Sequence, residues 1–383
     1  MQMKSVALIT EYNPFHNGHL YHAQTAKKMT QADITIAIMS GHFVMRGMPA
    51  MFNKFQRARM ALAGVDLVIE LPLIGALSSS DYFAKMGVLM AEYLSADALC
   101  FGSEDGNIDH LQQAATQLLS FENTATYHQA IKEGKTYARI VAESLENNIM
   151  REPNNILGIA YLKQLQILNS SITPYTIQRQ HTQHHQQNIN HETFASGSAI
   201  RESLIKGSTT WHDMVPEVNH HLFNMPFYDQ QRLFDFLKLT ISQHDARSLS
   251  RIYTMSEGFE HRLIKCIQSA TSYDNLMQQL KTKRYTYTHI QRVLMNVLLN
   301  IVKDDVTHTI DAARVLAMSA QGQAYLKWLK QNAPDRQIIT NINQSNVSFF
   351  TNEIKATNIY NVLTGQTQTD FNTPVFIDNY NKV

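Results

Sequence analysis

Two histidines three residues apart, His16 and His19, stand in the stretch NPFHNGH, between an apolar run and a helical pattern. The first turn of a helix presents unpaired N–H groups and a partial positive charge, so a strand, a tight turn and a helix together form an anion site. Gly18 lets phosphate approach the backbone, and imidazole N–H groups donate hydrogen bonds to phosphate oxygens as charge builds in a transition state. Taken alone, an H-x-x-H pair is more often incidental, so the rest of the chain has to support this chemistry.

Charged and polar side chains also follow other apolar runs. Arg46, Lys54 and Arg57 come after one run, where they could neutralise phosphate charge or form a solvated basic loop. Ser103 and Glu104 end another run, where they could position a ribose or a metal ion, or only satisfy a turn. The glycine-rich phosphate motifs G-x-x-x-x-G-K-[ST] and G-x-G-x-x-G are absent from the sequence. Phosphate chemistry in this chain therefore depends on the histidines.

Short runs rich in β-branched residues must position these side chains. They alternate with helical patterns, which predicts a doubly wound α/β layer with a parallel sheet. In such a layer ligands bind beyond the carboxyl ends of the strands, so the loops TEYNPFHNGH, SGHFVMRG and FGSED are expected to converge on one crevice. The predicted strands are residues 5–10, 34–40, 66–72, 97–104 and 173–179, and residues 80–94 are predicted to form a helix with one apolar face.

Strand-like runs fade after about residue 210, and helical patterns replace them. The strongest amphipathic pattern lies in residues 288–302, where Ile290, Leu294 and Val297 recur at helical spacing. We therefore predict two domains, an α/β domain with the histidine motif at residues 1–210 and a mainly α-helical domain at residues 211–383. The predicted helices of the second half are residues 229–242, 258–271, 288–302 and 311–330, followed by one in NEIKATNIYNVL.

Composition excludes several classes of protein. Charged residues make up 17% and the formal net charge is +1, so the chain has no general attraction to nucleic acid or membrane. Without a run of about 18 apolar residues or a secretory signal, we expect a cytoplasmic protein with no membrane partner. Cys100 and Cys266 are too few for a disulfide framework, and Cys100 is expected in the core. In residues 180–191 four histidines could hold a metal, but the pattern favours a solvated loop.

A local basic stretch, KTKRYTYTHIQR, is the strongest candidate for RNA contact. Cations at a helix start oppose the helix dipole, so RNA phosphate rather than local stability would favour them. Tyr285 and Tyr287 could stack on unpaired bases. A solvated helix end is the alternative. The candidate RNA-binding residues are Lys281, Lys283, Arg284 and Arg292.

The stretch NPFHNGH resembles the H-x-G-H motif of the nucleotidylyltransferase superfamily, which includes the class I aminoacyl-tRNA synthetases. The second superfamily element, a serine-rich turn that opens a helix and ends in arginine, is matched by SGSAIR, with Ser196, Ser198 and Arg201. We expect Ser198 to cap the helix and Arg201 to reach the β and γ phosphates. The resemblance implies attack on the α-phosphate of ATP, with pyrophosphate leaving.

Longer stretches are similar to the bacterial tRNA(Met) cytidine acetate ligase family. They are SGHFVMRGMPAMFNKFQRARMALAGVDLVIELP, SSSDYFAKMGVLMAEYLSADALCFGSE and PNNILGIAYLKQL, and the likeness continues weakly in KTKRYTYTHIQRVLMNVLL and ARVLAMSAQG. His42 and Met45 stand where the family pattern has asparagine and glutamine. The resemblance implies an enzyme that uses ATP and Mg²⁺ to convert acetate to acetyl-adenylate. It then acetylates the wobble cytidine of elongator tRNA(Met).

The resemblance also implies the residues of the site. His16, His19 and Arg201 would be catalytic, and no metal ligand is implied. Either Asn154 or Asn155 would contact ATP, and the sequence does not separate them. The implied ATP-binding residues are Ala7, Leu8, Ile9, Thr10, Glu11, Tyr12, Asn13, Pro14, Phe15, His16, Asn17, Gly18, His19 and Leu20, with Gly102, Asn154, Asn155, Arg179 and Ser198.

Two other functions use the same residues. A small-molecule adenylyltransferase would join AMP to a phosphorylated metabolite, and its helical half would have no RNA role. A nucleotide-binding regulator would keep the fold without turnover. The release of pyrophosphate from ATP, tested separately with acetate and with tRNA, separates the three functions.

Overall fold

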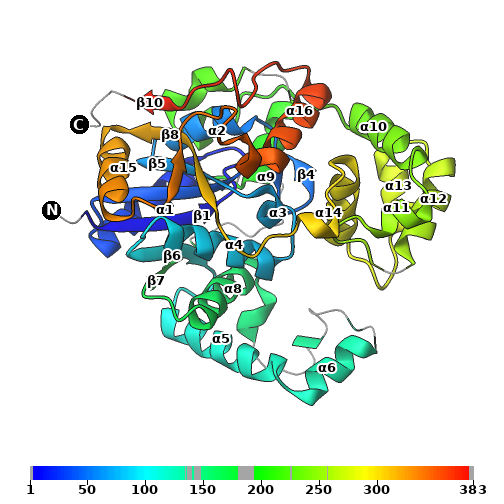
Figure 1. Ribbon diagram of the computed structural model, residues 1–383, viewed down its shortest axis with the longest axis horizontal. Helices are drawn as coiled ribbons and strands as arrows, with labels where there is room; N and C mark the ends of the chain where they lie inside the picture. Colours follow the sequence, from blue (N-terminus) through cyan, green and yellow to red (C-terminus); the bar gives the residue numbers. More distant parts are fainter. Residues whose placement is uncertain are drawn as a thin grey trace.

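A mixed, mostly parallel sheet forms the centre of the computed structural model, which describes residues 3–133, 135, 140–141, 148–179, 194–224, 227–256 and 258–378. The strand order is β10-β8-β5-β2-β1-β6-β7, with β9 paired to β8 (Figure 1). Strand β8 runs antiparallel to β5, whereas β5, β2, β1, β6 and β7 are mutually parallel. The strands are β1 (Ser5–Thr10), β2 (Ile34–Ser40), β5 (Leu67–Leu71), β6 (Ala98–Ser103), β7 (Thr173–Gln178), β8 (Ala312–Ser319), β9 (Gln337–Ile339) and β10 (Phe376–Asp378), with a separate hairpin of β3 (Phe43–Val44) and β4 (Met48–Pro49).

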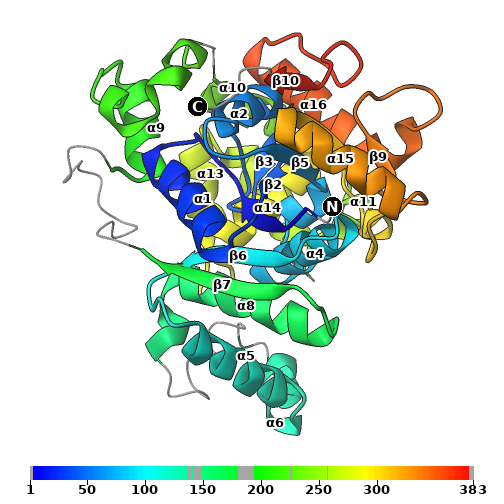
Figure 2. The ribbon, with the colours of Figure 1, turned by 90° about the vertical axis from the view of Figure 1, so that its left-hand side faces the viewer.

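Helices cover both faces of this sheet because its buried strands alternate their side chains between two cores. In β6, Leu99 and Phe101 join the core beneath α4, α8 and α15, whereas Ala98 and Cys100 join the core beneath α1 and α2. Figure 2 shows α8 and then α5 as successive layers beside β6 and β7. The helices of these layers are α1 (Asn17–Thr30), α2 (Lys54–Ala61), α3 (Leu73–Ala76), α4 (Ser80–Tyr93), α5 (Ile108–Glu122), α6 (Ala125–Lys132), α8 (Pro153–Ile167), α9 (Gly197–Ile205), α15 (Ala320–Asn332) and α16 (Thr351–Thr364).

The doubly wound sheet and its five predicted strands are confirmed, with ends that differ by one residue at most. The predicted helix at residues 80–94 corresponds to α4, and Cys100 lies in the core with 1% of its surface exposed. Among the described residues, no helix is both long and apolar enough to cross a bilayer.

A helical unit stands beside the sheet, on the right in Figure 1. Its apolar faces form a third core, which includes Leu237, Leu263 and Leu294. Three of its helices correspond to the predicted ones at residues 229–242, 258–271 and 288–302. The helices of the unit are α10 (Gln230–Ser242), α11 (Ala246–Ser250), α12 (Phe259–Ser269), α13 (Tyr273–Leu280) and α14 (Tyr287–Leu298).

Residues 312–378 correct the description of 211–383 as one mainly helical domain. The predicted helix at 311–330 is wrong in its first half, because residues 312–319 form strand β8 and only residues 320–332 form helix α15. Strand β8 is buried from Ala313 to Ser319, so it has no alternation of polar and apolar residues to distinguish it from a buried helix. The chain therefore leaves the sheet for the helical unit and returns to it, and the boundary at residue 210 stays a proposal.

Candidate active site

The turn between β1 and α1 brings the two histidines face to face. His16 is the N-cap residue of α1, and its Nδ1 accepts a hydrogen bond of 3.1 Å from the Gly18 N–H. His19 Nδ1 accepts a bond of 3.3 Å from the His16 N–H, and the two rings stack with centroids 3.7 Å apart. The pair thus forms a capping box in which imidazole nitrogens take the places of the usual Ser and Glu oxygens.

This arrangement sets the tautomer of both rings. Because each Nδ1 is an acceptor, a neutral imidazole in this turn carries its proton on Nε2. Each ring therefore presents an N–H donor on the edge that the cap does not use. Gly18 makes room for the pair, since a Cβ there would lie 2.9 Å from His16 Cε1. The turn supplies two fixed donors beside a helix N-terminus.

Both rings are held neutral. Burial, with smaller contributions from the cations Arg179 and Arg201, lowers the pKa of His16 to about 3. Burial also lowers the pKa of His19 well below its usual 6.5, with contributions from His16, His22 and Arg179. A neutral imidazole with its proton on Nε2 is already a hydrogen-bond donor to phosphate, so no change of protonation is needed before it binds.

This neutrality leads to an expected pH profile. If His16 and His19 stay neutral in the free protein, kcat/KM for ATP should show no histidine ionisation as the pH falls from about 7 to about 5. The profile would be measured by pyrophosphate exchange into ATP, with ATP kept as its magnesium complex. An acid limb with an apparent pKa near the ordinary histidine value would contradict the tautomer assignment.

Arg201 is brought onto the same turn by helix α9. Its Nη1 donates to the Asn13 carbonyl over 2.7 Å and its Nη2 donates to Ser198 Oγ over 3.1 Å. The expectation that Ser198 caps the helix is wrong. The helix begins at Gly197, so the residue before it, Ser196, is the N-cap. The Ser196 side chain accepts a hydrogen bond from the Ala199 N–H. The H-x-G-H turn and the helix of the SGSAIR stretch therefore meet at Asn13.

A second wall of the crevice lies beyond the ends of β6 and β7. Asn155 is 3% exposed, and its Oδ1 accepts from the backbone N–H groups of Glu104 and Asp105 at 2.9 and 3.1 Å. The side-chain amide of Asn154 donates to the Glu104 carboxylate and remains partly exposed. Asn155 thus holds the turn after β6, and Asn154 is the better placed of the two to meet a ligand.

Gly102 lies opposite Arg179 in this wall. A Cβ on Gly102 would lie 3.6 Å from Arg179 Cγ, which is ordinary contact, so the protein itself does not require glycine there. Ser103 Oγ accepts from the Gly106 N–H and bonds Thr176 Oγ1, which makes it part of a satisfied turn. Close approach of a ligand remains the reason to expect Gly102 in the site.

The cations after β2 divide into one exposed and two buried side chains. Arg57 is fully buried and donates to backbone carbonyls of Phe52, Glu11, Ser40 and Gly41, which joins the carboxyl ends of β1 and β2. Lys54 is neither a phosphate ligand nor part of a solvated loop, since it too is fully buried. Arg46 is exposed and stays a candidate for phosphate contact.

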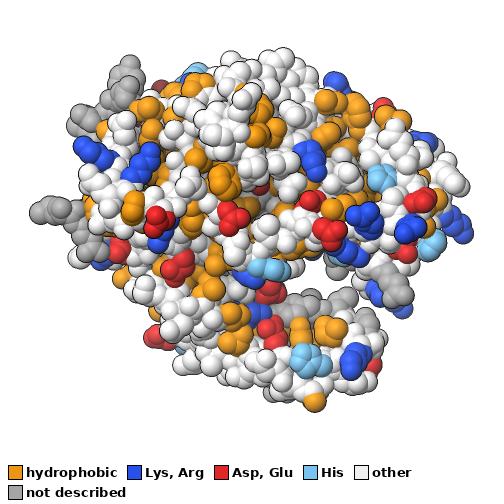
Figure 3. Space-filling model, viewed as in Figure 1, with side chains coloured by type: hydrophobic (Ala, Val, Ile, Leu, Met, Phe, Trp, Pro, Cys, Tyr) orange, Lys and Arg blue, Asp and Glu red, His pale blue; other side chains and the backbone are white. Residues whose placement is uncertain are grey.

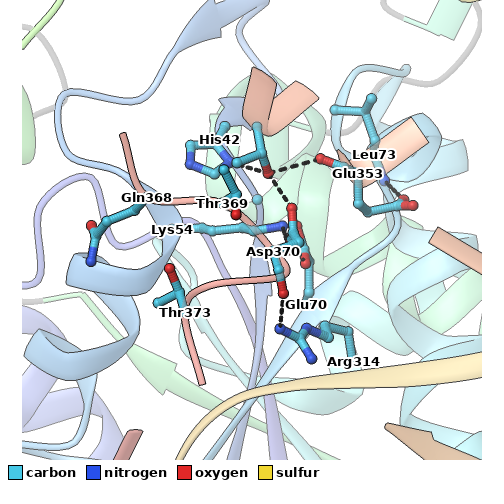
Figure 4. Close-up of polar contacts among 12 residues, drawn as sticks. His42, Lys54, Glu70, Leu73, Arg314, Glu353, Gln368, Thr369, Asp370 and Thr373 are labelled. Atoms are coloured by element: carbon cyan, nitrogen blue, oxygen red, sulfur yellow. Dashed lines mark hydrogen bonds and ion pairs between the residues drawn. The ribbon is translucent and has the colours of Figure 1, made fainter. Parts of the chain in front are cut away.

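Lys54 lies in a buried polar cluster with Glu70 and Asp370 (Figure 4). Its Nζ is 2.9 Å from both carboxylate oxygens of Glu70 and 2.8 Å from Asp370 Oδ1. Burial alone would lower the pKa of Lys54, but the two carboxylates raise it above its ordinary value. Burial raises the pKa of Glu70 to about 7 in spite of Lys54. This cluster was missed from the sequence because its members lie on α2, β5 and the segment after α16.

Comparisons with known proteins decide the family. Residues 3–373 match the HIGH Nucleotidyl Transferase family model. A tRNA(Met) cytidine acetate ligase from Staphylococcus haemolyticus is 52% identical over 380 residues, which cover 99% of this chain and 100% of that protein. One from Staphylococcus aureus strain MRSA252 is 54% identical over 374 residues, 97% of this chain and 99% of that protein. The chain belongs to the tRNA(Met) cytidine acetate ligase family.

Solved structures of the same family have the same fold. The ligand-free TmcAL of Thermotoga maritima has a TM-score of 0.88 and 26% identity, covering 99% of this chain and 100% of that one. TmcAL of Thermotoga maritima bound with alpha-thio ATP has a TM-score of 0.84 and 27% identity, covering 98% and 100%. The resemblance on which the sequence analysis relied is thereby confirmed along the whole chain.

Of the two residues that depart from the family pattern, His42 is buried and Met45 is partly exposed. His42 is 1% exposed, lies 3.4 Å from Thr357 Oγ1 through its Nδ1, and packs against the Tyr360 ring at 4.5 Å. Met45 takes part through its backbone, whose N–H donates to Glu11 Oε1 over 2.5 Å. A change of side chain at Met45 therefore preserves that bond.

The four basic residues assigned to tRNA divide into two pairs. Lys283 and Arg284 are exposed just before α14. Lys281 Nζ donates to the carbonyls of Thr282 and Tyr285, so these bonds stabilise the loop before α14. Arg292 is partly buried and its Nη1 donates to the Met45 carbonyl over 3.3 Å.

The surface of the helical unit is mixed in charge rather than uniformly basic. On the face drawn in Figure 3, Lys and Arg side chains over this unit stand among Asp and Glu side chains. The histidine-rich stretch 180–191 lies outside the described residues. Within the part of the chain that is described, no group of three or more His, Cys, Asp and Glu side chains could hold a metal ion.

Proposed function

We propose that this chain activates acetate with ATP as acetyl-adenylate and transfers the acetyl group to the wobble cytidine of elongator tRNA(Met). The relatives that share more than half of its residues are named tRNA(Met) cytidine acetate ligases, and TmcAL binds an ATP analogue. One observation in the structure carries the proposal. The two neutral histidines and Arg201 converge on one turn at the carboxyl end of β1, where a nucleotide triphosphate would lie.

In the first step, an acetate oxygen attacks the α-phosphorus of ATP and the bond to pyrophosphate breaks. Acetate is already a nucleophile, so this step needs alignment and charge stabilisation rather than a base. The Nε2–H groups of His16 and His19 would donate to oxygens that gain charge, and Arg201 would hold the departing phosphates. Magnesium would arrive on the ATP phosphates, as is usual for this ion.

In the second step, the N4 amine of cytidine attacks the acetyl carbon of the mixed anhydride. The carbon–oxygen bond to AMP breaks, and the amine loses a proton. The chain needs no covalent intermediate of its own for this reaction. Cys100 is not a candidate nucleophile, because burial raises the pKa of its thiol to about 12. The proposal includes a cytoplasmic location, where tRNA and ATP are available.

Acetate-dependent exchange of pyrophosphate into ATP tests the first step directly. We expect exchange with acetate alone and no requirement for tRNA, because adenylate formation precedes RNA contact. N4-acetylcytidine in tRNA(Met) would then be measured by mass spectrometry of nucleosides. Exchange that depends only on a phosphorylated metabolite would favour a small-molecule adenylyltransferase, and no turnover at all would favour a regulator.

The exposed pair Lys283 and Arg284 provides a test of the RNA face. Replacing both with alanine should weaken tRNA(Met) binding and reduce the slope of log affinity against log salt by roughly one to two units, since each phosphate contact releases counterions. Binding would be measured by filter retention over a range of salt concentrations. Pyrophosphate exchange on the same preparations separates a binding defect from misfolding, and an unchanged salt slope would place the RNA face elsewhere.

A further inference from the structure

The β3–β4 hairpin lies between the nucleotide-binding turn and the helical unit, and one residue of its loop is bonded to both. The Met45 N–H donates to the Glu11 carboxylate over 2.5 Å, and Glu11 directly precedes the histidine turn. The Met45 carbonyl accepts from Arg292 Nη1 over 3.3 Å, and Arg292 belongs to α14 of the helical unit. The backbone of Met45 therefore joins the two parts of the molecule.

The hairpin also packs tightly on α14. Gly47 has a φ of +79°, and an added Cβ would lie 2.3 Å from the Arg292 backbone nitrogen and 2.5 Å from the Gln291 carbonyl carbon. Tyr273 Oη donates to Met48 Sδ over 3.2 Å from α13. These contacts leave the loop little freedom to move relative to the helical unit.

Arg46 is the side chain that this loop exposes. It directly follows Met45, whose N–H is bonded to the Glu11 carboxylate, so the backbone of Arg46 lies beside Glu11. Burial raises the pKa of Glu11, and the charges of Arg57, Arg46 and Arg201 oppose that rise. Arg201 is itself bonded to Asn13 in the histidine turn. The segment after the hairpin is tied to the same turn, since the Met51 N–H donates to Asn13 Oδ1 over 2.8 Å. The Arg46 backbone and the Arg201 side chain are therefore both anchored to residues 11–13, where an anion with several charges can meet both cations.

We propose that Arg292 is a positioning residue of the adenylation site, which holds the Met45 backbone from the helical unit and so places Arg46 beside Arg201 for the triphosphate of ATP. This inference rests on the proposed function and deepens it. It moves Arg292 from the RNA face, where the sequence analysis placed it, to the first chemical step. It also makes the helical unit part of the adenylation site, since α14 supplies the bond that fixes the loop.

A double-mutant cycle between Arg292 and Arg46 tests the proposal. We expect Arg292→Gln and Arg46→Gln each to lower kcat/KM for ATP in acetate-dependent exchange by roughly 10-fold, the scale for one charge-assisted hydrogen bond. The double variant should be no worse than Arg46→Gln alone, because Arg292 acts only through Arg46. Arg292→Lys, which keeps a cationic donor, should recover part of the loss. The assay contains no tRNA.

Arg251→Gln is the matched control, since this side chain is 67% exposed on the same helical unit and only faces Asp304 at 3.7 Å. The proposal would be overturned if the losses in kcat/KM of the two single variants added fully in the double variant. It would also be overturned if Arg292→Gln showed normal pyrophosphate exchange but weakened tRNA binding. Circular dichroism excludes an unfolded variant, and Arg292→Lys remains informative if Arg292→Gln does not fold. Absence of acetate-dependent exchange in the parent protein would instead overturn the proposed function.

Discussion

Replacing His19 with alanine is expected to lower acetate-dependent pyrophosphate exchange by roughly 10²-fold or more, the scale for losing one donor that acts in a transition state. The same loss is expected for His16. Both rings are neutral and present Nε2–H groups on the edge that the helix cap leaves unused. The charge on the phosphate oxygens grows as pyrophosphate leaves, so the effect should appear mainly in kcat rather than in KM.

The capping role of His16 has to be separated from its chemical role. His16→Ala also removes the acceptor for the Gly18 N–H, and loss of an N-cap costs about 1 kcal/mol of stability. His16→Asn keeps an oxygen that can cap the helix but lacks an imidazole. We expect His16→Asn to restore most of the thermal stability and little of the exchange activity.

An exposed histidine provides the control for these variants. His128 lies on α6 with its ring against Tyr127, outside the histidine turn. His128→Ala should keep exchange within a few-fold of the parent. A folded His19→Ala protein with activity in that same range would show that the pair only caps helix α1.

Much of the catalytic layer could be predicted because its strands are short, apolar and bounded by polar loops. The runs 5–10, 34–40 and 173–179 match β1, β2 and β7 within a residue. The sequence predicts a helix where strand β8 lies. Every residue from Ala313 to Ser319 is buried, so the alternation of polar and apolar residues that marks a strand is missing. Its antiparallel pairing with β5 is a tertiary contact that local pattern does not encode.

Some residues of the candidate site could likewise be predicted from the sequence, and others could not. The position of His16, His19 and Arg201 on one turn could be expected because their motifs resemble those of a known superfamily, and their catalytic roles stay a proposal. The roles of Lys54 and Arg57 could not be predicted, because whether a cation is solvated or buried depends on partners far away in the chain. Asp370 lies 2.8 Å from the Lys54 ammonium although more than 300 residues separate them. Sequence spacing indicates nothing about such a pair.

Lys54→Met is expected to lower the free energy of unfolding by about 3–5 kcal/mol, the usual cost of breaking a buried ion pair by removing one partner. The substitution would leave Glu70 and Asp370 facing each other with exposures of 4% and 2% and without their shared ammonium (Figure 4). Asp370 follows α16, and Thr357 of α16 donates to its other oxygen. The loss should therefore loosen the attachment of the C-terminal segment to the sheet.

The pH dependence of this loss has a definite sign. Without Lys54, the pKa of Glu70 in the folded state rises further, since burial and the neighbouring Asp370 both disfavour its charge. The folded variant then holds more protons than the unfolded chain, so its stability falls as the pH rises. Urea unfolding at about pH 5 and about pH 8 should show the larger deficit at the higher pH. Adding Glu70→Gln should recover part of it, because one unpaired charge is removed.

Lys206→Met is the matched control for the lost cation. Lys206 forms an ion pair of 2.7 Å with Glu202 on the surface of α9, and its side chain is 68% exposed. Solvent screens such a pair, so its loss should change the free energy of unfolding by at most about 0.5 kcal/mol. An equally small effect of Lys54→Met at both pH values would contradict a stabilising role for its ion pairs with Glu70 and Asp370. The ammonium would then add nothing that packing does not already provide.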